Sequence, residues 1–459
     1  MVSQTRGTLA QFAASIPGAQ LVGSDVAFEG VSTDSRTAPA GALFVALKGE
    51  TFDAHDFLAQ VAGRGVAAVV VHALPQGWTL PAIVVPDTLV ALGRIANAWR
   101  SQYAIPVIGV TGSNGKTTVK EMIAAILAAA FGDDARLATQ GNLNNEIGVP
   151  LTLFRLRAEH RAAVIEMGMN HPGEIKRLAA IAQPTVAMVN NAQREHQEFM
   201  HTVEAVAREN GSVLQALAKD GVAVFPGDDA YTDLWRGMAP CPVLTFGLSE
   251  DCDVRAGYVS TGFGNELTVH ARGAQARIEL AAAGEHNVRN ALAAFASTLA
   301  AGIPMDAIVR GLEAFAPVGG RLQRKQAVNG ATVIDDTYNA NPDSMRAAID
   351  VLAAYPSPRI LVAGDMGEVG TQGKEFHEEV AAYAQARGID TVLAFGELAR
   401  HMTAFSAQHY EQFDELLAAL DQTLGGNSKT TVLVKGSRFM KMERVVQHLT
   451  GQNISKDAH

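Results

Sequence analysis

The stretch Thr111-Gly112-Ser113-Asn114-Gly115-Lys116-Thr117-Thr118 decides the fold, because it joins a buried strand to a helix. The apolar run at residues 106–110 predicts the strand, and the helix is expected from residue 117 to about residue 130. Glycines let successive backbone N–H groups face inward at the positive end of a helix, which makes an anion-binding nest. The stretch therefore predicts a phosphate-binding loop.

Two side chains of this loop suit a nucleoside triphosphate. Lys116 would reach the β- and γ-phosphates as a point charge, and the Thr117 hydroxyl would ligate Mg²⁺. The strict pattern has glycine where this chain has Val110, and a chance strand–glycine–helix junction is the alternative explanation. Because Gly-Lys-Thr-Thr follows directly, we interpret the loop as a site for ATP and Mg²⁺.

Short apolar runs on both sides of the loop predict further buried strands. They lie at residues 42–47, 67–71, 82–85, 163–167, 186–190, 360–363, 391–395 and 431–434. Strands that alternate with helical segments predict an α/β fold with mostly parallel sheets. We expect three domains: a smaller N-terminal α/β domain (1–103), a central P-loop domain with a parallel sheet (104–317) and a C-terminal Rossmann-like α/β domain (318–459).

The composition excludes some partners. The chain has 47 acidic and 37 basic residues, a formal charge of -10, which argues against nucleic acid and anionic membranes as partners. No run of about 18 apolar residues predicts a membrane span, and the first residues lack a signal-peptide layout. Cys241 and Cys252 could form a disulfide, but two cysteines in so long a chain fit a reducing cytosol. We therefore expect a cytoplasmic protein.

Two candidate metal ligands follow later strands. Glu166 ends an apolar run, so its carboxylate would open onto the crevice at the carboxyl ends of the strands and could hold Mg²⁺ opposite Thr117. The alternative is an edge acid that caps a helix. His196 follows the run at residues 186–190 and could be a second ligand, although a loop histidine is more often simply solvated.

Two further segments are rich in amides. Asn287 and Asn290 lie one helical turn apart and could read an adenine edge, although N-capping by Asn287 explains the pattern equally well. The segment Asp335-Asp336-Thr337-Tyr338-Asn339-Ala340-Asn341-Pro342-Asp343-Ser344 follows the predicted strand at residues 331–334. So many polar groups suggest a ligand site, and turn chemistry is the alternative.

Taken together, these segments resemble the Mur ligases of bacterial cell-wall synthesis. The loop matches that family with Val110 included, as do Glu166, His196, the segment 286–291 and the pair Gly320-Arg321. The resemblance implies ATP-dependent amide-bond formation through an acyl phosphate, with Lys116, Glu166 and His196 as the catalytic residues. It also implies nucleotide contacts from the loop, from Asn287 and Asn290, and from Arg321, Asp336 and Asn339 once the third domain closes.

Other segments narrow the resemblance within the family. Residues 32–36 and 39–49 are similar to the uridine-nucleotide domain of the two late ligases. Residues 335–342, 361–370 and 434–438 resemble the member that joins D-alanyl-D-alanine to UDP-N-acetylmuramoyl-tripeptide, and the Asp-Asn-Pro-Arg motif of the diaminopimelate-adding ligase is missing. The implied substrate contacts are Ser32, Asp34, Ser35, Arg36, Phe44, Lys48, Asn142 and Asn145.

One position departs from the family pattern. Many members have a carbamylated lysine that holds a second Mg²⁺, and this chain has Asn210 there. Asparagine cannot be carbamylated, so a second metal must be held differently or more weakly. The residues around His196 also differ from the commoner Ala-His-Leu-Glu.

Two kinds of alternative remain. The first is another ligase of the superfamily, either the diaminopimelate-adding ligase or a folylpolyglutamate synthase. The second is a nucleotide-driven switch or transport ATPase, which would leave the segment 34–36 and the asparagines near residue 339 unexplained. Nothing in the sequence requires more than a monomer.

Overall fold

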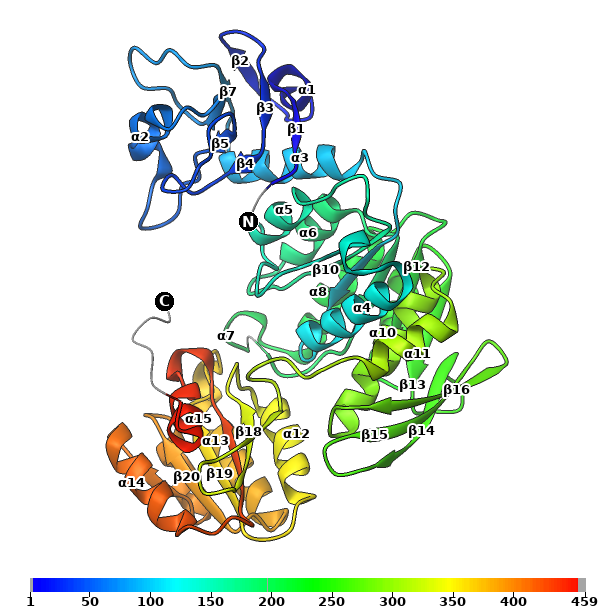
Figure 1. Ribbon diagram of the computed structural model, residues 1–459, viewed down its shortest axis with the longest axis vertical. Helices are drawn as coiled ribbons and strands as arrows, with labels where there is room; N and C mark the ends of the chain where they lie inside the picture. The colour runs from blue at the N-terminus through cyan, green and yellow to red at the C-terminus, as the bar shows by residue number, and fades with distance from the viewer. Residues whose placement is uncertain (1–2, 196, 453–459) are drawn as a thin grey trace.

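The computed structural model describes residues 3–195 and 197–452. Within these residues the strands form four sheets, two in the N-terminal region, one in the central region and one in the C-terminal region. Figure 1 shows the three regions following one another from top to bottom, with the long helix α3 (Thr88–Arg100) beneath the N-terminal sheets. The sheets confirm the predicted α/β class. The boundaries at residues 103 and 317 stay predictions, and we use them to name the regions.

The N-terminal region holds a small mixed sheet with the strand order β2-β7-β6-β5-β4. The predicted runs are confirmed as β5 (Leu43–Val45), β6 (Ala68–Val71) and β7 (Ala82–Val84), which pair in parallel. The other elements are β1 (Arg6–Thr8), α1 (Leu9–Ala13), β2 (Gln20–Val22), β3 (Ala27–Glu29), β4 (Val31–Ser32) and α2 (Leu58–Gly63). Asp87 starts α3, because its carboxylate accepts hydrogen bonds from the N–H groups of Leu89 and Val90.

The central region is built on a nine-stranded sheet with the order β16-β15-β14-β13-β12-β11-β8-β10-β9. Its parallel part is made of β8 (Val107–Thr111), β9 (Arg136–Ala138), β10 (Ala162–Glu166), β11 (Val186–Val189), β12 (Val222–Pro226), β13 (Val243–Gly247) and β14 (Val254–Ser260). An antiparallel extension follows through β15 (Asn265–Ala271) and β16 (Ala274–Leu280), which we did not predict.

Helices cover both faces of this sheet. The strand β8 alternates its side chains, so Val107 joins the apolar cluster on one face while Ile108 and Val110 join the cluster on the other. One face carries α4 (Lys116–Phe131), α10 (Glu285–Ala300) and α11 (Met305–Glu313). The opposite face carries α5 (Gly148–Leu153), α6 (Glu174–Ala182), α8 (Val203–Gln215) and α9 (Thr232–Met238). The short helix α7 (Gln197–Met200) lies toward the C-terminal region (Figure 1).

The C-terminal region has a six-stranded sheet with the order β17-β18-β22-β19-β20-β21, and all its pairings except β17–β18 are parallel. Its strands are β17 (Gln323–Gln326), β18 (Thr332–Asp336), β19 (Arg359–Gly364), β20 (Thr391–Phe395), β21 (Gln408–Tyr410) and β22 (Thr431–Lys435). Its helices are α12 (Pro342–Ala353), α13 (Gly373–Ala386), α14 (Phe413–Leu424) and α15 (Glu443–Thr450). This arrangement confirms the predicted second α/β unit.

The N-terminal and central regions share one apolar core. A single cluster contains Phe12 and Ile95 from the first region and Leu178 from the second. Arg100, which is 6% exposed, donates to the carbonyl oxygens of Ala182 and Gln183 at the end of α6, at 3.1 Å each. A basic side chain satisfies carbonyl groups that a helix end leaves without partners. The two regions are therefore joined through buried contacts.

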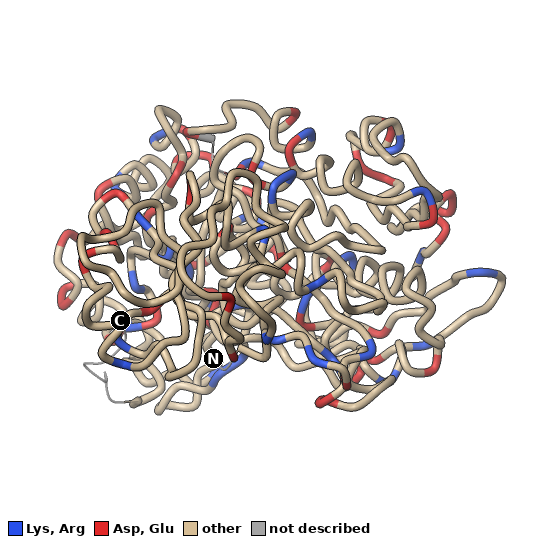
Figure 2. The backbone as a smooth tube through the Cα atoms, turned by 90° about the horizontal axis from the view of Figure 1, so that it is seen from above, with Lys and Arg blue, Asp and Glu red and all other residues tan. Residues whose placement is uncertain are grey.

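The C-terminal region meets the central region through smaller, largely polar contacts. One is at the β14–β15 turn, where the Phe263 ring centre lies 4.8 Å from that of Tyr355 and 4.4 Å from the Arg324 guanidinium. Others surround the phosphate-binding loop and are described below. Figure 2 shows acidic and basic residues intermingled along the backbone. Among residues 3–195 and 197–452, no helix combines the length and apolarity needed to cross a bilayer.

Candidate active site

The phosphate-binding loop lies between β8 and α4, as predicted. Gly112 and Gly115 have φ angles of 135° and 81°, which favour glycine. A Cβ atom on Gly115 would come within 2.3 Å of the Asn290 side-chain oxygen and 2.6 Å of the Asn190 side-chain nitrogen. The backbone can follow this path because both positions are glycine. The first turn of α4 therefore opens toward the loop with N–H groups that the helix itself does not use, an arrangement suited to an anion.

Lys116 bends back over this loop. Its ammonium donates to the carbonyl oxygens of Gly112, at 2.5 Å, and Ser113, at 3.0 Å, and lies 3.4 Å from a carboxylate oxygen of Glu195. Its side chain is 17% exposed and that of Glu195 is 7% exposed. A partly buried cation is thus held at the mouth of the anion nest.

A second group of polar atoms surrounds Glu166, the last residue of β10. Thr117 donates its hydroxyl to Glu166 Oε1 at 3.2 Å, and Asn144 donates its amide to the same oxygen at 2.8 Å. The other oxygen, Oε2, is buried and has no hydrogen-bond partner among the described residues. The strand register pairs Glu166 with Val110. The carboxylate therefore faces the loop from the next strand, and within residues 3–195 and 197–452 it accepts no hydrogen bond from a helix N–H group.

These atoms fit the predicted Mg²⁺. The ion prefers hard oxygen ligands and is usually held by one or two carboxylates together with substrate phosphates. A buried carboxylate oxygen without a partner, beside a threonine hydroxyl, offers that chemistry. No three His, Cys, Asp or Glu side chains come together as a ligand set in the part of the chain that the structure describes. The other predicted ligand, His196, lies outside the described residues.

Asn210 is fully buried in α8, beneath the start of the loop. Its side-chain oxygen accepts a hydrogen bond from the Thr111 hydroxyl at 2.8 Å. Its amide nitrogen is buried without a partner among the described residues. The side chain therefore supports the strand end that leads into the loop.

A chain of amides supports the other side of the loop. Asn190 donates to the Asn114 backbone oxygen at 2.7 Å and to Asn290 Oδ1 at 2.9 Å, and Asn290 donates to Asn287 Oδ1 at 3.1 Å. Asn287 is the third residue of α10, whose N-cap is Gly284, so the N-capping alternative is wrong. Asn287 instead donates to the Ala283 oxygen at 2.8 Å.

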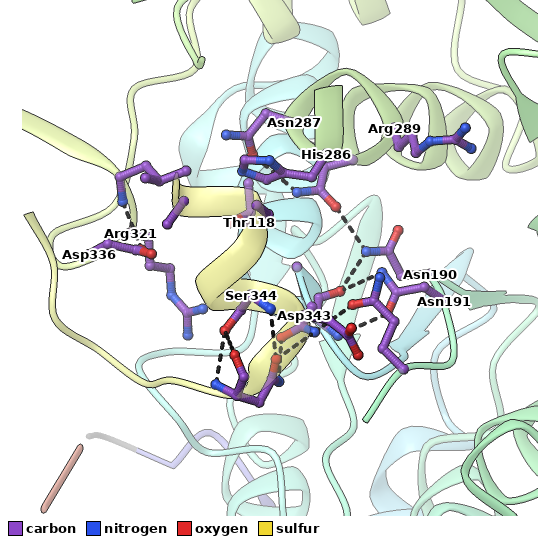
Figure 3. A pocket seen from close by; sticks show the side chains of 18 of the residues that line it. Thr118, Asn190, Asn191, His286, Asn287, Arg289, Arg321, Asp336, Asp343 and Ser344 are labelled. Carbon is purple, nitrogen blue, oxygen red and sulfur yellow. Dashed lines mark hydrogen bonds between the residues drawn. The ribbon is translucent and has the colours of Figure 1, made fainter. Parts of the chain in front are cut away.

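These residues line a cavity of about 360 Å³. Figure 3 shows side chains around it from several parts of the chain, among them Asn190 and Asn191 after β11, His286 and Asn287 on α10, and Asp343 and Ser344 on α12. Burial lowers the pKa of His286, so its imidazole is neutral at pH 7. The predicted residues Asn114, Gly115 and Thr118 also line this cavity. A nucleotide base and sugar would find amide donors and acceptors there.

The C-terminal region closes this cavity with the predicted residues Arg321, Asp336 and Asn339. Arg321 donates to the Thr117 hydroxyl at 2.9 Å and lies 4.1 Å from the centre of the Tyr338 ring. Lys435 forms an ion pair with Asp336 at 2.6 Å and donates to the Asn339 backbone oxygen at 2.8 Å. Sequence elements more than two hundred residues apart are thus brought together at the loop.

A larger cavity, of about 630 Å³, lies on the other side of the loop. It is lined by Lys116, Thr117 and Glu166, by the predicted residues Asn142 and Asn145, and by C-terminal residues that include Arg321 and Tyr338. Arg321, Tyr338, Asn114 and Gly115 also line the smaller cavity, so the two cavities meet at the loop. A group in one cavity could react with a phosphate held from the other.

The predicted substrate contacts of the N-terminal region lie apart from both cavities. Ser32, Asp34, Ser35, Arg36 and Lys48 lie at strand ends and turns, whereas Phe44 is fully buried in an apolar cluster. The Arg36 guanidinium pairs with the Asp34 carboxylate at 3.0 Å and holds the pKa of that carboxyl below its usual value. No residue of this group is among the lining residues of either cavity.

Three family models match consecutive parts of the chain. They are the Mur ligase family catalytic domain at residues 27–100, the Mur ligase middle domain at residues 110–298 and the Mur ligase glutamate ligase domain at residues 320–438. The chain belongs to the Mur ligase family. As a Mur ligase, it is an ATP-dependent enzyme that forms amide bonds.

Similar proteins span nearly the whole Mur ligase chain. The UDP-N-acetylmuramoyl-tripeptide–D-alanyl-D-alanine ligase of Haemophilus influenzae is 40% identical over 443 residues, covering 95% of this chain and 97% of that protein. The crystal structure of MurF from Acinetobacter baumannii has a TM-score of 0.92 at 35% identity and covers 98% of this chain and 100% of that chain. MurF from Thermotoga maritima, in complex with ADP, has a TM-score of 0.83 at 26% identity, with coverages of 92% and 97%.

Sequence reasoning about this Mur ligase missed several residues of the site. Asn144 reaches Glu166, whereas the predicted Asn145 accepts from the N–H groups of Ile147 and Gly148 just before and at the start of α5. The run Asn142-Leu143-Asn144-Asn145 predicts a polar segment, but the sequence does not show which of its amides points toward Glu166. Glu195 and Lys435 were missed as well, because their partners lie far away in sequence.

Proposed function

We propose that this Mur ligase joins D-alanyl-D-alanine to UDP-N-acetylmuramoyl-tripeptide, with ATP converted to ADP and phosphate. One observation of the structure carries the proposal: the phosphate-binding loop lies where the two cavities meet. The smaller cavity offers amides to a nucleotide, and the larger one gives a peptide carboxylate access to its terminal phosphate. The substrates are those named for the Haemophilus influenzae relative.

The reaction has two chemical steps. The terminal carboxylate of the tripeptide attacks the γ-phosphate, so that an acyl phosphate forms and ADP leaves. The amine of D-alanyl-D-alanine then attacks the acyl carbon, loses a proton and displaces phosphate. The chain itself has little covalent chemistry to do, and its task is to position the groups and to stabilise negative charge.

Lys116 and the first turn of α4 carry the charge stabilisation. The ammonium lies at the loop beside the larger cavity, and the N–H groups of the helix start point at the same region. Arg321 adds a second cation from the C-terminal region through its contact with Thr117. Because these donors come from two regions, the site is complete only when the regions are docked, and docking also keeps water from the acyl phosphate.

Thr117 and Glu166 would hold Mg²⁺, with His196 proposed as a further ligand. Bound there, the ion would neutralise charge on the phosphoryl oxygens. The chain's part is to keep the carboxylate oriented, and Asn144 does so through its hydrogen bond to Oε1. Asn287, Asn290, Asp336 and Asn339 are proposed to contact or support the nucleotide.

The uridine end of the substrate is proposed to bind the N-terminal region through Ser32, Asp34, Ser35, Arg36 and Lys48, with Phe44 packed beneath. Asn142 and Asn145 would contact the peptide in the larger cavity. The active unit is proposed to be a monomer. Cys241 and Cys252 are free thiols, which supports a cytoplasmic setting.

Phosphate release from ATP tests the proposal. We expect release with UDP-N-acetylmuramoyl-tripeptide and D-alanyl-D-alanine together, and at most a single-turnover amount without the dipeptide. Offering diaminopimelate or glutamate as the amine, with the matching acceptors, separates the other ligases of the superfamily. ATP hydrolysis that needs no acceptor would contradict the proposal and favour a nucleotide-driven switch.

A further inference from the structure

Arg194 connects the central region to two carboxylates of the C-terminal region. It lies in the loop between β11 and α7, and its guanidinium donates to Asp343 on α12 at 2.6 Å and to Glu379 on α13 at 2.7 Å. It also donates to the second Glu379 oxygen at 2.9 Å, and its backbone N–H donates to Asp343 at 2.9 Å. Planar, paired contacts of this kind need arginine and are stronger than single ones.

The contact, which we name the Arg194 clasp (Arg194, Asp343 and Glu379), is partly shielded from water. The side chains are 23%, 24% and 34% exposed, and the guanidinium lies 5.4 Å from the centre of the Phe376 ring. Exposed pairs within one helix, such as Arg310 with Asp306, have side chains that are 57% and 70% exposed. Fully solvated pairs contribute little, so the clasp should contribute more than they do.

The loop that carries the clasp also touches the phosphate-binding loop. The Gln193 side-chain oxygen accepts from the Asn114 amide at 2.6 Å, and Gln193 N–H donates to the Ser113 hydroxyl at 2.9 Å. On the other side of Arg194, Glu195 lies 3.4 Å from Lys116. The position of the clasp is therefore fixed relative to the atoms that bind phosphate.

Docking at the clasp brings two C-terminal side chains to the phosphate-binding loop. Asn341 precedes Asp343 by two residues and donates to Asn114 Oδ1 at 2.9 Å. It also begins α12, where its side chain and that of Ser344 form a capping box. Arg321 reaches Thr117 from the same region. Arg194 thus binds the first turn of α12 through Asp343, and the N-cap of the same helix, Asn341, contacts the phosphate-binding loop.

We propose that Arg194 is a positioning residue that docks the C-terminal region onto the phosphate-binding loop. Arg194 also lines the larger cavity, and the role proposed for it is to hold α12 and α13 where Asn341 and Arg321 complete the site. The contact at Phe263 lies at the β14–β15 turn and does not involve the clasp, so it keeps the regions together when the clasp is removed. Loss of the clasp therefore loosens the docking without separating the regions. The inference rests on the proposed function only where its test measures the rate with D-alanyl-D-alanine.

The test compares wild type with Arg194→Ala, Arg194→Lys and Glu379→Gln, and with Arg310→Ala as a matched control. Small-angle X-ray scattering of the full chain without substrates measures docking. We expect a larger radius of gyration for Arg194→Ala and Glu379→Gln, an intermediate value for Arg194→Lys, which keeps the charge but not the planar fork, and no change for the control.

Kinetics supply the second readout. With saturating ATP, we expect kcat/KM for D-alanyl-D-alanine to fall about tenfold in Arg194→Ala, because the change leaves Asp343 without its cation and leaves Glu379 with Arg346 alone. The Kd for UDP alone should not change, because the contacts proposed for the uridine end lie in the N-terminal region, away from the clasp and from both cavities. Arg194→Lys should recover part of the lost rate.

Several results would overturn the inference. Arg194→Ala could match the control in both scattering and rate, or lose activity with an unchanged radius of gyration, in which case the arginine acts on the phosphate-binding loop directly. If Arg194→Ala does not fold, the Glu379→Gln variant tests the inference. A radius of gyration and a rate equal to those of wild type in that variant would reject the docking role of the clasp. If wild type forms no product with D-alanyl-D-alanine, the proposed function fails, and the scattering comparison still tests the docking.

Discussion

The central region has two neighbours, and it meets them in different ways. Toward the N-terminal region the apolar core is continuous, and the buried Arg100 satisfies the end of α6. Toward the C-terminal region the contacts are mostly side-chain hydrogen bonds and ion pairs around the two cavities, with a small aromatic contact of Phe263 at the β14–β15 turn. Regions of one chain move relative to each other unless their interface is large and apolar. The difference teaches that the first two regions form one body, and that the site lies at the boundary which can open.

The largest effect is expected from breaking the apolar junction. Trp99 is 5% exposed and donates its indole N–H to the Leu156 oxygen at 3.3 Å. Trp99→Ala should lower the free energy of unfolding of the joined body by about 3–5 kcal/mol, the usual cost of removing a buried tryptophan. Urea unfolding measures it, and Val328→Ala, at a residue that is 78% exposed, is the control. Separate unfolding of the two regions in wild type would contradict a shared core.

Lys116→Ala should produce the next largest effect, at the polar boundary. We expect turnover to fall about a hundredfold to a thousandfold, or about 3–4 kcal/mol, as is typical when one preorganised donor to a developing anion is removed. The unfolding curve should stay that of wild type, because the ammonium lies at the loop and not in the core. Phosphate release measures turnover. A near-normal rate would show that Lys116 does not stabilise the transferred phosphoryl group.

Glu166→Ala tests the candidate metal ligand on the same boundary. The Mg²⁺ concentration for half-maximal rate should rise at least about tenfold, since metal affinity responds strongly even to residues around the ligands. Titration of activity with MgCl₂ measures the shift. Asn144→Ala provides a graded comparison, because it removes the hydrogen bond that orients Glu166 but keeps the carboxylate. An unchanged titration in Glu166→Ala would reject this residue as a ligand.

A smaller effect is expected from the amide pair across the boundary. Asn114 and Asn341 exchange hydrogen bonds at 2.9 and 3.4 Å. A double-mutant cycle with alanine at each position, read from kcat/KM for the dipeptide, should give a coupling of about 0.5–1.5 kcal/mol. A coupling near zero would mean that the two regions are not docked in the active state.

The smallest effect is expected from a change of pH on the docking of the C-terminal region. Arg194 holds the pKa of the Glu379 carboxyl below its usual range, and Arg346 adds to this. Because the pKa of Glu379 is lowered in the docked state, its ion pair stabilises docking fully above the ordinary glutamate pKa of about 4.3. This stabilisation of docking is lost as the pH falls through the lowered pKa of Glu379. The radius of gyration should therefore not change between pH 8 and pH 6. Expansion in that interval would point to a histidine instead.

The elements with local signals were predicted from the sequence. The loop at residues 111–118 lies between a strand and a helix as expected, and Glu166 ends its strand beside it. The antiparallel extension was missed, although residues 265–271 alternate buried and more exposed side chains and a turn with Arg272 and Gly273 follows them. Alternation of this kind is the usual signal of a half-buried strand.

The contacts at the boundary could not be predicted in the same way. Arg194 is separated by 149 residues from Asp343 and by 185 residues from Glu379. No spacing rule connects charges at such distances, because their meeting depends on how two folded regions dock. Likewise, the fully buried Phe44 looked like a ligand contact from its motif, whereas the structure places it in a core.

The larger cavity has walls from both bodies, and this has a consequence for inhibitor design. A compound that contacts Glu166 alone binds only the central region, so it does not need the C-terminal region to be docked. A compound that also contacts Tyr338 binds both regions and needs the docked arrangement. The apparent affinity of the second compound is reduced by the fraction of enzyme that is undocked. Screening against a variant with tighter docking would therefore detect compounds whose apparent affinity for the wild-type enzyme is too low to measure.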